Sequence, residues 1–251
     1  MSLEWEIFCR STTGSTTLAR CIGHNGETTY LQWLMSAWGW TVSVALSGFV
    51  IALILGVVIG TLRTLPARPW ARGFAATWVE LFRDIPLLVQ VFLWYHVVPF
   101  FLPALKSLPS WLLVSIALGL FTSARIAEQV RAGIQSLPRG QRDAARALGM
   151  REVQVYRFVL LPVALRVMLP ALTSEAMNIV KNSSVAFAVA VAELTQFAMQ
   201  AQEETARGVE IYLAVTALYA LTALAVNRVL VLIEARVQVP GIGGLARSGA
   251  G

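Results

Sequence analysis

The sequence predicts an all-α, polytopic membrane protein with about five transmembrane helices. Of its 251 residues, 57% are hydrophobic and only 14% are charged, and the mean hydropathy is +0.65. A soluble domain normally carries about a quarter charged residues. The basic residues, nearly all arginine, gather in short segments between apolar runs that are long enough to cross about 30 Å of hydrocarbon. These observations place the chain in a bilayer.

The first apolar run follows a more polar N-terminal stretch. Residues 1–35 are expected to form an extracytoplasmic tail, in which Cys9 and Cys21 could pair as a disulfide or remain two free thiols. The first span is expected at about Trp38–Leu62, because this run contains no charged residue. Three glycines that favour close helix packing recur along one face of it: Gly48, Gly56 and Gly60.

Four more spans are expected after the first. The arginine-rich segment 63–83 precedes them and is expected to be a cytoplasmic loop. The third span should continue helically past Arg125 towards Leu137, whereas the fourth is interrupted by charged residues. In chain order the four spans are Ile85–Leu105, Trp111–Ala124, Met168–Met199 and Ile211–Ile233.

The distribution of arginine predicts the orientation. Segments 63–83 and 125–166 hold most of the positive charge, and positively charged loops remain in the cytoplasm. The acid-rich segment 200–210 suits the outside. Five crossings then place the N-terminus outside and the C-terminus inside. The expected organisation is one transmembrane domain over 36–236 followed by a cytoplasmic tail over 237–251.

The longest polar segment lies in the middle of the chain. Within the expected cytoplasmic loop 137–162, Arg139–Leu148 should form a short helix, because Pro138 suits a helix start and Gly149 can adopt the left-handed conformation that ends one. Small and apolar residues on one face and charges off it are typical of a helix pressed against another protein. The expected apolar face is Gln141, Ala144, Ala145 and Leu148, and the charges off it are Arg139, Asp143 and Arg146.

This loop resembles the EAA loop of ABC importer permeases. That pattern is Glu-Ala-Ala, three residues, Gly, nine residues and Ile-x-Leu-Pro. The chain has Asp143-Ala144-Ala145, Gly149 and Val159-x-Leu161-Pro162 at the same spacing. Asp for Glu and Val for Ile are the two departures, and neither changes the charge sign or the class of side chain. The resemblance implies that the loop docks on an ATPase.

Two further stretches, Val79–Gln90 and Leu172–Ser184, resemble the permeases of polar amino-acid importers. Within that group, further motifs resemble the glutamate/aspartate type most: Trp94-Tyr95, Gln129–Gln141, Glu234-Ala235-Arg236 and Pro240-Gly241. The resemblance covers nearly everything from Tyr30 to Gly241. It implies the type I ABC importer permease fold in a bacterial inner membrane, and an amino-acid substrate of the glutamate/aspartate kind.

The resemblance also implies partners. Two ATPase subunits would dock on the loop and use the ATP, so no cofactor is bound directly by this chain. A second permease subunit would complete a homo- or heterodimer, and a periplasmic amino-acid binding protein would deliver the substrate. The residues expected to couple to the ATPases are Arg139, Gln141, Asp143, Ala144, Ala145, Leu148 and Gly149.

Polar residues inside the expected spans are candidates for the substrate pathway. Charges within a membrane are costly and normally face protein or a water-filled cavity. The candidates are Glu175, Asn178, Lys181, Asn182, Ser183 and Gln90. Lys181, the only lysine in an expected span, is expected to attract the carboxylate of an acidic substrate. The alternative is an internal pair of Glu175 with Lys181 that serves packing only.

A charge pair just before a proline marks the entrance to the second expected span. Arg83, Asp84 and Pro86 could form a gate at the cytoplasmic mouth, or simply a helix boundary with an arginine that reaches the interface.

Motifs for catalysis or metal binding are missing from the sequence. His24 and His96 stand apart, and neither lysine follows a glycine as a phosphate-binding loop requires. The chain is therefore expected to be a translocation subunit and not an enzyme. An ion-coupled secondary amino-acid transporter and a membrane scaffold remain as alternatives.

Overall fold

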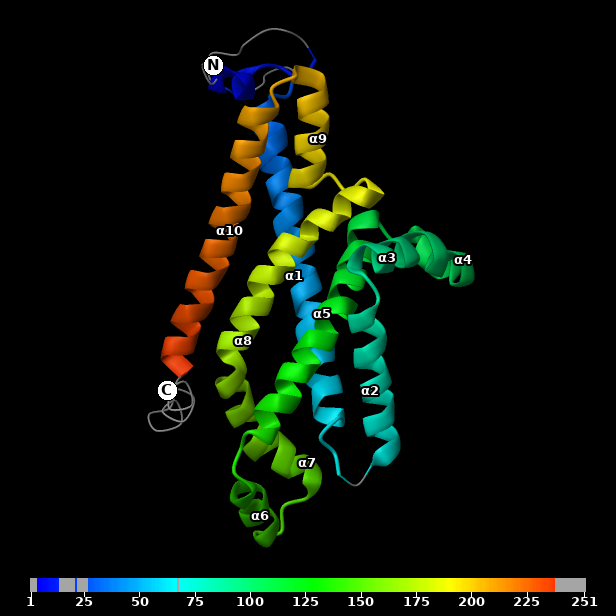
Figure 1. Cartoon of the computed structure of the whole chain (residues 1–251), viewed down its shortest axis with the longest axis vertical. Coiled ribbons are helices and arrows are strands. Elements are labelled where there is room, and N and C mark those ends of the chain that lie inside the picture. Colours follow the sequence, from blue (N-terminus) through cyan, green and yellow to red (C-terminus); the bar gives the residue numbers. More distant parts are fainter. Residues whose placement is uncertain (1–3, 14–20, 22–26, 67, 238–251) are drawn as a thin grey trace. The chain divides into compact units, whose positions relative to one another are not determined.

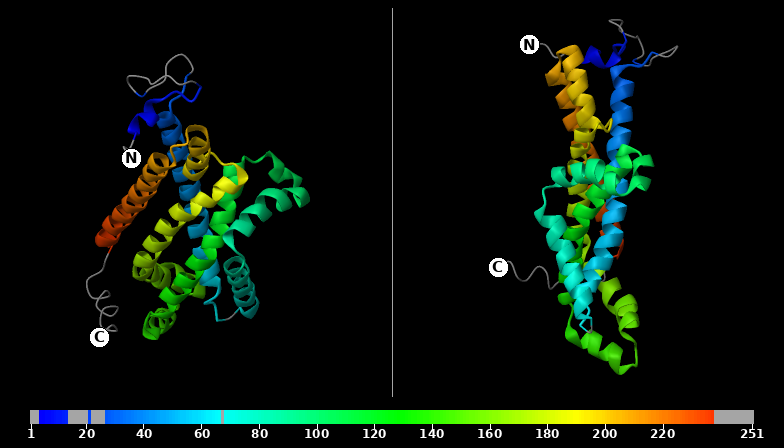
Figure 2. Two further views of the ribbon diagram at one scale, coloured as in Figure 1. Left: turned by 45° about the horizontal axis from the view of Figure 1, so that its top comes forward. Right: turned by 90° about the vertical axis from the view of Figure 1, so that its right-hand side faces the viewer.

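The computed structural model describes residues 4–13, 21, 27–66 and 68–237. Within this part of the chain the secondary structure is helical, apart from one isolated antiparallel bridge between Ser11 and Thr29. Figure 1 shows the helices in chain order and Figure 2 gives two further views. The predicted all-α fold is confirmed. The expected C-terminal tail, with Pro240-Gly241, lies outside the described residues except for Val237.

The α-helices are α1 Tyr30–Leu62, α2 Pro69–Asp84, α3 Leu87–Phe92, α4 Val98–Phe101, α5 Ser110–Gln135, α6 Arg139–Ala147, α7 Glu152–Gln154, α8 Leu161–Asn182, α9 Leu194–Thr205 and α10 Gly208–Val237. Short 3₁₀ and π segments connect several of them: η1 Trp5–Cys9, η2 Leu93–Val97, η3 Pro103–Ser107, η4 Val155–Leu160 and η5 Ser183–Val189.

Four helical stretches in the described chain are long and apolar enough to cross a membrane. A fifth is obtained if α2 and the helix that follows it are counted as one broken span, in agreement with the predicted number. The four stretches are Tyr30–Leu62, Ser110–Gln135, Glu152–Val189 and Gly208–Val237.

The second and fourth spans are placed differently from the prediction. The segment 63–83, expected to be a cytoplasmic loop, is mostly the helix α2. This helix ends at Asp84, because the next residue, Ile85, precedes a proline and is sterically driven into an extended conformation (φ −86°, ψ 129°). The fourth span begins earlier than Met168 and ends at Val189, since Ala190 adopts a left-handed conformation (φ 55°).

By their contacts, the residues divide into two compact units. The first unit comprises residues 1–48, 87–118 and 179–224, and the second comprises 49–86, 119–178 and 225–251. Each unit is described by itself.

In the first unit, the N-terminal segment packs on α9 and on the start of α10. Ile7 and Phe8 are buried in a core shared with residues of α1, α9 and α10. Cys9 and Cys21 form a disulfide, so of the two possibilities for these thiols the paired one holds. Glu4 forms an ion pair with Arg207 at 2.6 Å. The described part of the expected tail is therefore folded, and α1 already begins at Tyr30.

Glu193 starts α9 from a buried position outside the membrane spans. Its carboxylate accepts hydrogen bonds from the backbone N–H groups of Thr195 (2.8 Å) and Gln196 (2.9 Å), as a helix cap does, and from the hydroxyl of Tyr219 (2.6 Å). Burial raises the pKa of Glu193, and these hydrogen bonds oppose that shift. Glu193, which lies within the expected fourth span, is thus the N-cap of α9.

In the second unit, glycines let α1 approach α5 closely. A Cβ atom added at Gly60 would lie 2.6 Å from the carbonyl oxygen of Ala127 and from Cβ of Val130. A Cβ atom added at Gly56 would likewise lie 2.5 Å from Cγ2 of Ile126. The predicted role of these glycines in helix packing is confirmed, because any larger side chain would separate the two helices.

Candidate functional site

The short helix α6 forms where the sequence predicts it. Pro138 precedes it with an extended backbone (φ −56°, ψ 131°), and the helix runs from Arg139 to Ala147. Gly149 has φ +78°, which only glycine adopts without strain. Its N–H donates to the carbonyl of Arg146 (2.9 Å), which closes the C-terminal end of the helix.

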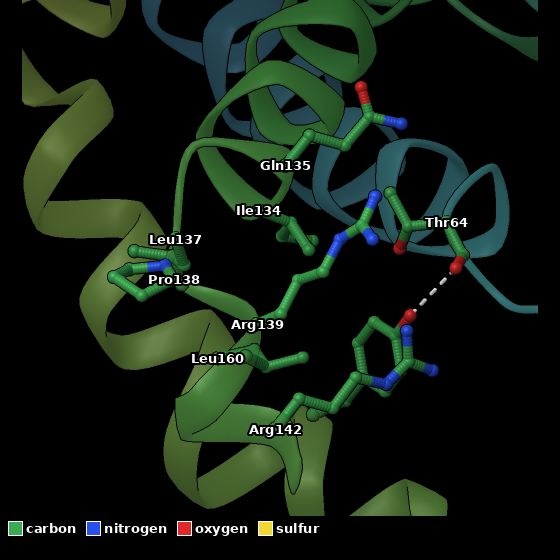
Figure 3. A pocket seen from close by; sticks show the side chains of 9 residues that line it. Thr64, Ile134, Gln135, Leu137, Pro138, Arg139, Arg142 and Leu160 are labelled. Atoms are coloured by element: carbon green, nitrogen blue, oxygen red, sulfur yellow. Dashed lines mark hydrogen bonds between the residues drawn. The ribbon is translucent and has the colours of Figure 1, made fainter.

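Ion pairs hold α6 against the segment that follows it. Arg142 donates to a carboxylate oxygen of Glu152 at 3.0 Å, and Nε of Arg146 donates to the other oxygen at 2.7 Å. The guanidinium of Arg142 also lies over the ring of Tyr156, 5.5 Å from its centroid. The hydroxyl of Tyr156 in turn donates to the carbonyl of Thr64, in the α1–α2 connection, at 2.8 Å (Figure 3). These contacts link α6 to η4 and to the α1–α2 connection.

A cavity of about 350 Å³ lies between α6 and these supports. Figure 3 shows Arg139 extending from the first turn of α6 towards Gln135 and Thr64 at its edge. The remaining lining residues are Ile134, Leu137, Pro138, Arg142, Tyr156 and Leu160.

The outer face of α6 differs from the apolar face that was predicted. Ala145 is buried and Gln141 is half-buried, so these two residues support the helix from inside. Ala144 is exposed, and 82% of Leu148 is exposed, although both were expected on the same face as Ala145. The sequence pattern could not separate the two sides because small and apolar residues occur on both. The exposed residues are Arg139, Gly140, Asp143, Ala144, Arg146, Ala147, Leu148 and Gly149.

The candidate gate residues lie at the end of α2. Arg83 and Asp84 occupy its last turn, where Nε of Arg83 is 3.6 Å from a carboxylate oxygen of Asp84 and both side chains are largely exposed. Pro86 follows the extended Ile85. The structure thus brings the charge pair together at a break in the helix.

Glu175 has a partner that was not predicted. It is buried, and its carboxylate is 3.0 Å from Nε of Arg125 and accepts a hydrogen bond from the side-chain amide of Gln129 at 3.2 Å. The alternative pairing of Glu175 with Lys181 is therefore wrong. Spacing along α8 could not reveal partners that are supplied by α5, and the presence of Arg125 in an apolar helix was the one available indication.

The remaining pathway candidates differ in exposure. Lys181 is exposed, Asn178 and Asn182 are half-buried, and Gln90 is buried. Ser183 is also buried, and its hydroxyl donates to the backbone carbonyl of Val180 at 2.7 Å. Ser183 is thereby satisfied within its own helix.

The exposed faces of the long helices fall into two kinds. Those of α1 and α10 carry many large apolar side chains, such as Leu46 and Ile54 in α1 and Leu224 in α10. In contrast, α5 exposes no large hydrophobic residue among its described positions, and α8 exposes only Val167. Apolar faces suit lipid, whereas polar faces of membrane helices suit water or another subunit.

Residues 48–239 match the family of binding-protein-dependent transport system inner membrane components. The chain belongs to this family. Members of this family are permease subunits of inner-membrane ABC importers, so the chain is a multi-pass translocation component and not itself an enzyme.

Relatives of known name support this assignment. The glutamate/aspartate import permease protein GltJ of Escherichia coli K12 is 41% identical over 228 residues, which cover 86% of this chain and 92% of that protein. The probable amino-acid ABC transporter permease protein PatM of Vibrio harveyi is 33% identical over 205 residues, covering 82% and 92%.

Solved structures show the same fold. An amino acid ABC transporter crystallised with histidines has a chain that matches with a TM-score of 0.70 and 31% identity, covering 82% of this chain and 95% of that one. An inward-facing MetNI methionine ABC transporter matches with a TM-score of 0.65 at 22% identity, covering 84% and 96%, and this likeness concerns the fold alone.

The support of α6 can be tested by exchanging Glu152→Gln. This change removes the charge that pairs with Arg142 and Arg146, and two half-exposed pairs contribute roughly 1 kcal/mol. Hydrogen exchange of the α6 amides, measured by mass spectrometry on the purified complex, should accelerate about fivefold. Glu203→Gln, at an exposed carboxylate in α9, is the control and should change nothing in α6. Unaltered exchange in Glu152→Gln would show that these ion pairs do not hold the helix.

Proposed function

We propose that this chain is the permease subunit of an ATP-driven, binding-protein-dependent importer of glutamate and aspartate. The main support is the helix α6, which is held by ion pairs, has an exposed outer face and lies at the position of the EAA-type loop. The substrate class is supported by the 41% identity to the E. coli permease named for glutamate and aspartate.

In this proposal the outer face of α6 docks on an ATPase subunit. Leu148 is the one large apolar side chain exposed on α6 and its C-cap, and it would insert into the partner, with Asp143 and Arg139 beside it. ATP binding would draw the ATPases together and shift α6. The contacts of Arg142 and Tyr156 would carry that shift to the α1–α2 connection. From there α2 would carry it to the gate candidates Arg83, Asp84 and Pro86 at its other end.

The proposed assembly has two ATPase subunits, a second permease subunit in a homo- or heterodimer, and a periplasmic amino-acid binding protein. ATP is used by the ATPases, and this chain holds no cofactor. The pathway would run along the polar faces of α5 and α8, and the candidates on α8 are Glu175, Asn178, Lys181 and Asn182. Gln90 and Ser183, both buried, are further candidates. An ion-coupled transporter or a scaffold would have no need of a supported ATPase-docking helix.

We also propose that residues 1–35 are extracytoplasmic, that 36–236 form the permease domain with the coupling loop 137–162, and that 237–251 are cytoplasmic. The clustered arginines support this orientation. The disulfide between Cys9 and Cys21 supports it independently, because disulfides persist in oxidising compartments.

Thiol labelling tests the orientation. Single cysteines replace Glu203 in α9 and Asp143 in α6, both of which are exposed. The native cysteines are paired and should not react. In intact cells an impermeant maleimide is expected to label Glu203→Cys only, and Asp143→Cys should label after the membrane is opened. Labelling of Asp143→Cys from outside would reverse the orientation.

Uptake by the reconstituted complex tests the function. Proteoliposomes that contain the permease and ATPase subunits should take up glutamate when ATP and the loaded binding protein are supplied, and not when an ion gradient alone is applied. Leu148→Glu places a charge where an apolar contact is proposed and should lower ATPase binding and uptake by at least about tenfold. Leu148→Met keeps the apolar contact and is the control. Uptake driven by the ion gradient, or full uptake by Leu148→Glu, would contradict the proposal.

A further inference from the structure

The ion pair between Arg125 and Glu175 joins the interiors of two membrane helices. Arg125 is ten residues from the end of α5, a rise of about 15 Å, and Glu175 is fourteen residues from the start of α8, about 21 Å. Glu175 is only 5% exposed, whereas the side chain of Arg125 is 43% exposed. The pair therefore has a buried acidic half and an accessible basic half.

The contacts of Arg125 leave one edge of its guanidinium free. Nε is the atom that pairs with Glu175, at 3.0 Å from one carboxylate oxygen and 3.2 Å from the other. Among the described residues, neither terminal nitrogen of Arg125 has a hydrogen-bonding partner. Two parallel N–H groups on one edge of a guanidinium match the two oxygens of a carboxylate. Glu175 holds Nε of Arg125 and is itself held by the side-chain amide of Gln129, so the free edge is presented in a defined orientation.

The surroundings of Arg125 are not those of a lipid-facing surface. Gln129 and Ala132 follow it at intervals of four and seven residues on the same side of α5, and both are at least partly exposed. No large apolar side chain is exposed along the described length of this helix. A guanidinium at this depth would be strongly disfavoured in hydrocarbon, so it faces water or protein.

We propose that Arg125 binds a carboxylate of an acidic amino acid on its way through the permease, with Glu175 as the positioning residue. This inference rests on the proposed function and names the residue that recognises its substrate. An acidic amino acid carries one carboxylate more than a neutral one, and the free edge of Arg125 supplies the matching donors. Because Glu175 already offsets the charge of Arg125, the substrate is held weakly enough to leave again. Lys181 is exposed without a fixed geometry, and it cannot offer a planar pair of donors.

The decisive readout is glutamate taken up per ATP hydrolysed, in proteoliposomes that contain the complete complex and the loaded binding protein. Arg125→Gln removes the donors and should lower this ratio by roughly tenfold, the loss of one charge-assisted hydrogen bond. Arg228→Gln, which removes an exposed arginine from the lipid-facing helix α10, is the control and should keep the wild-type ratio. If wild-type complexes take up no acidic amino acid, the proposed function fails. If they do and Arg125→Gln keeps the wild-type ratio, this inference alone fails.

Two further variants separate recognition from structure. Arg125→Gln leaves Glu175 buried without its charge partner, which could prevent assembly. The double variant Arg125→Gln/Glu175→Gln restores neutrality and should assemble, still with the lowered ratio. Arg125→Lys keeps the ion pair, but its ammonium is occupied by Glu175, so the ratio should fall here too. A purely structural role predicts a wild-type ratio in both variants, and that result would overturn the inference.

Discussion

Charged side chains are costly within a membrane, and ion pairs between helices reduce that cost in this protein. A charged side chain in a span must pair with another group or face water, and the second unit meets this condition in two places. Arg63 at the end of α1 pairs with Glu128 of α5, which also pairs with Arg131 at 2.9 Å. Deeper in the helices, Glu175 is buried against Arg125. These pairs connect α1 and α8 to α5, so α5 is the central element of that unit.

The long helices also differ in the kind of face that they expose. Helices α1 and α10 expose many large apolar residues and can face lipid. The exposed residues of α5 and α8 are mainly small or polar. Under the proposed function, the substrate would pass beside α5 and α8. Close approach at Gly56 and Gly60 packs α1 tightly against α5. Helix α6 is linked to the α1–α2 connection through Arg142, which lies over Tyr156, and through the hydrogen bond from Tyr156 to Thr64.

Local chemistry made part of this predictable from the sequence. Pro138 and Gly149 determine where α6 begins and ends, and glycine spacing in α1 indicated close packing, because both effects act within one helix. The start of the second span was misplaced because the arginines of the amphipathic helix α2 made its segment resemble a basic loop. The partner of Glu175 and the division of α6 into two faces depend on contacts between helices, which spacing in one segment does not encode.

Aqueous access to the exposed faces of α5 and α8 tests whether these faces line the substrate pathway. Single cysteines at Ser174 in α8 and Ala132 in α5 should react with a water-soluble thiol reagent in the reconstituted complex, and their rates should change when ATP is bound. A cysteine at Ile54, an exposed position on the apolar face of α1, should remain unreactive in both states. If Ser174→Cys and Ala132→Cys were as unreactive as Ile54→Cys, the polar faces would not line a pathway and the account would be contradicted.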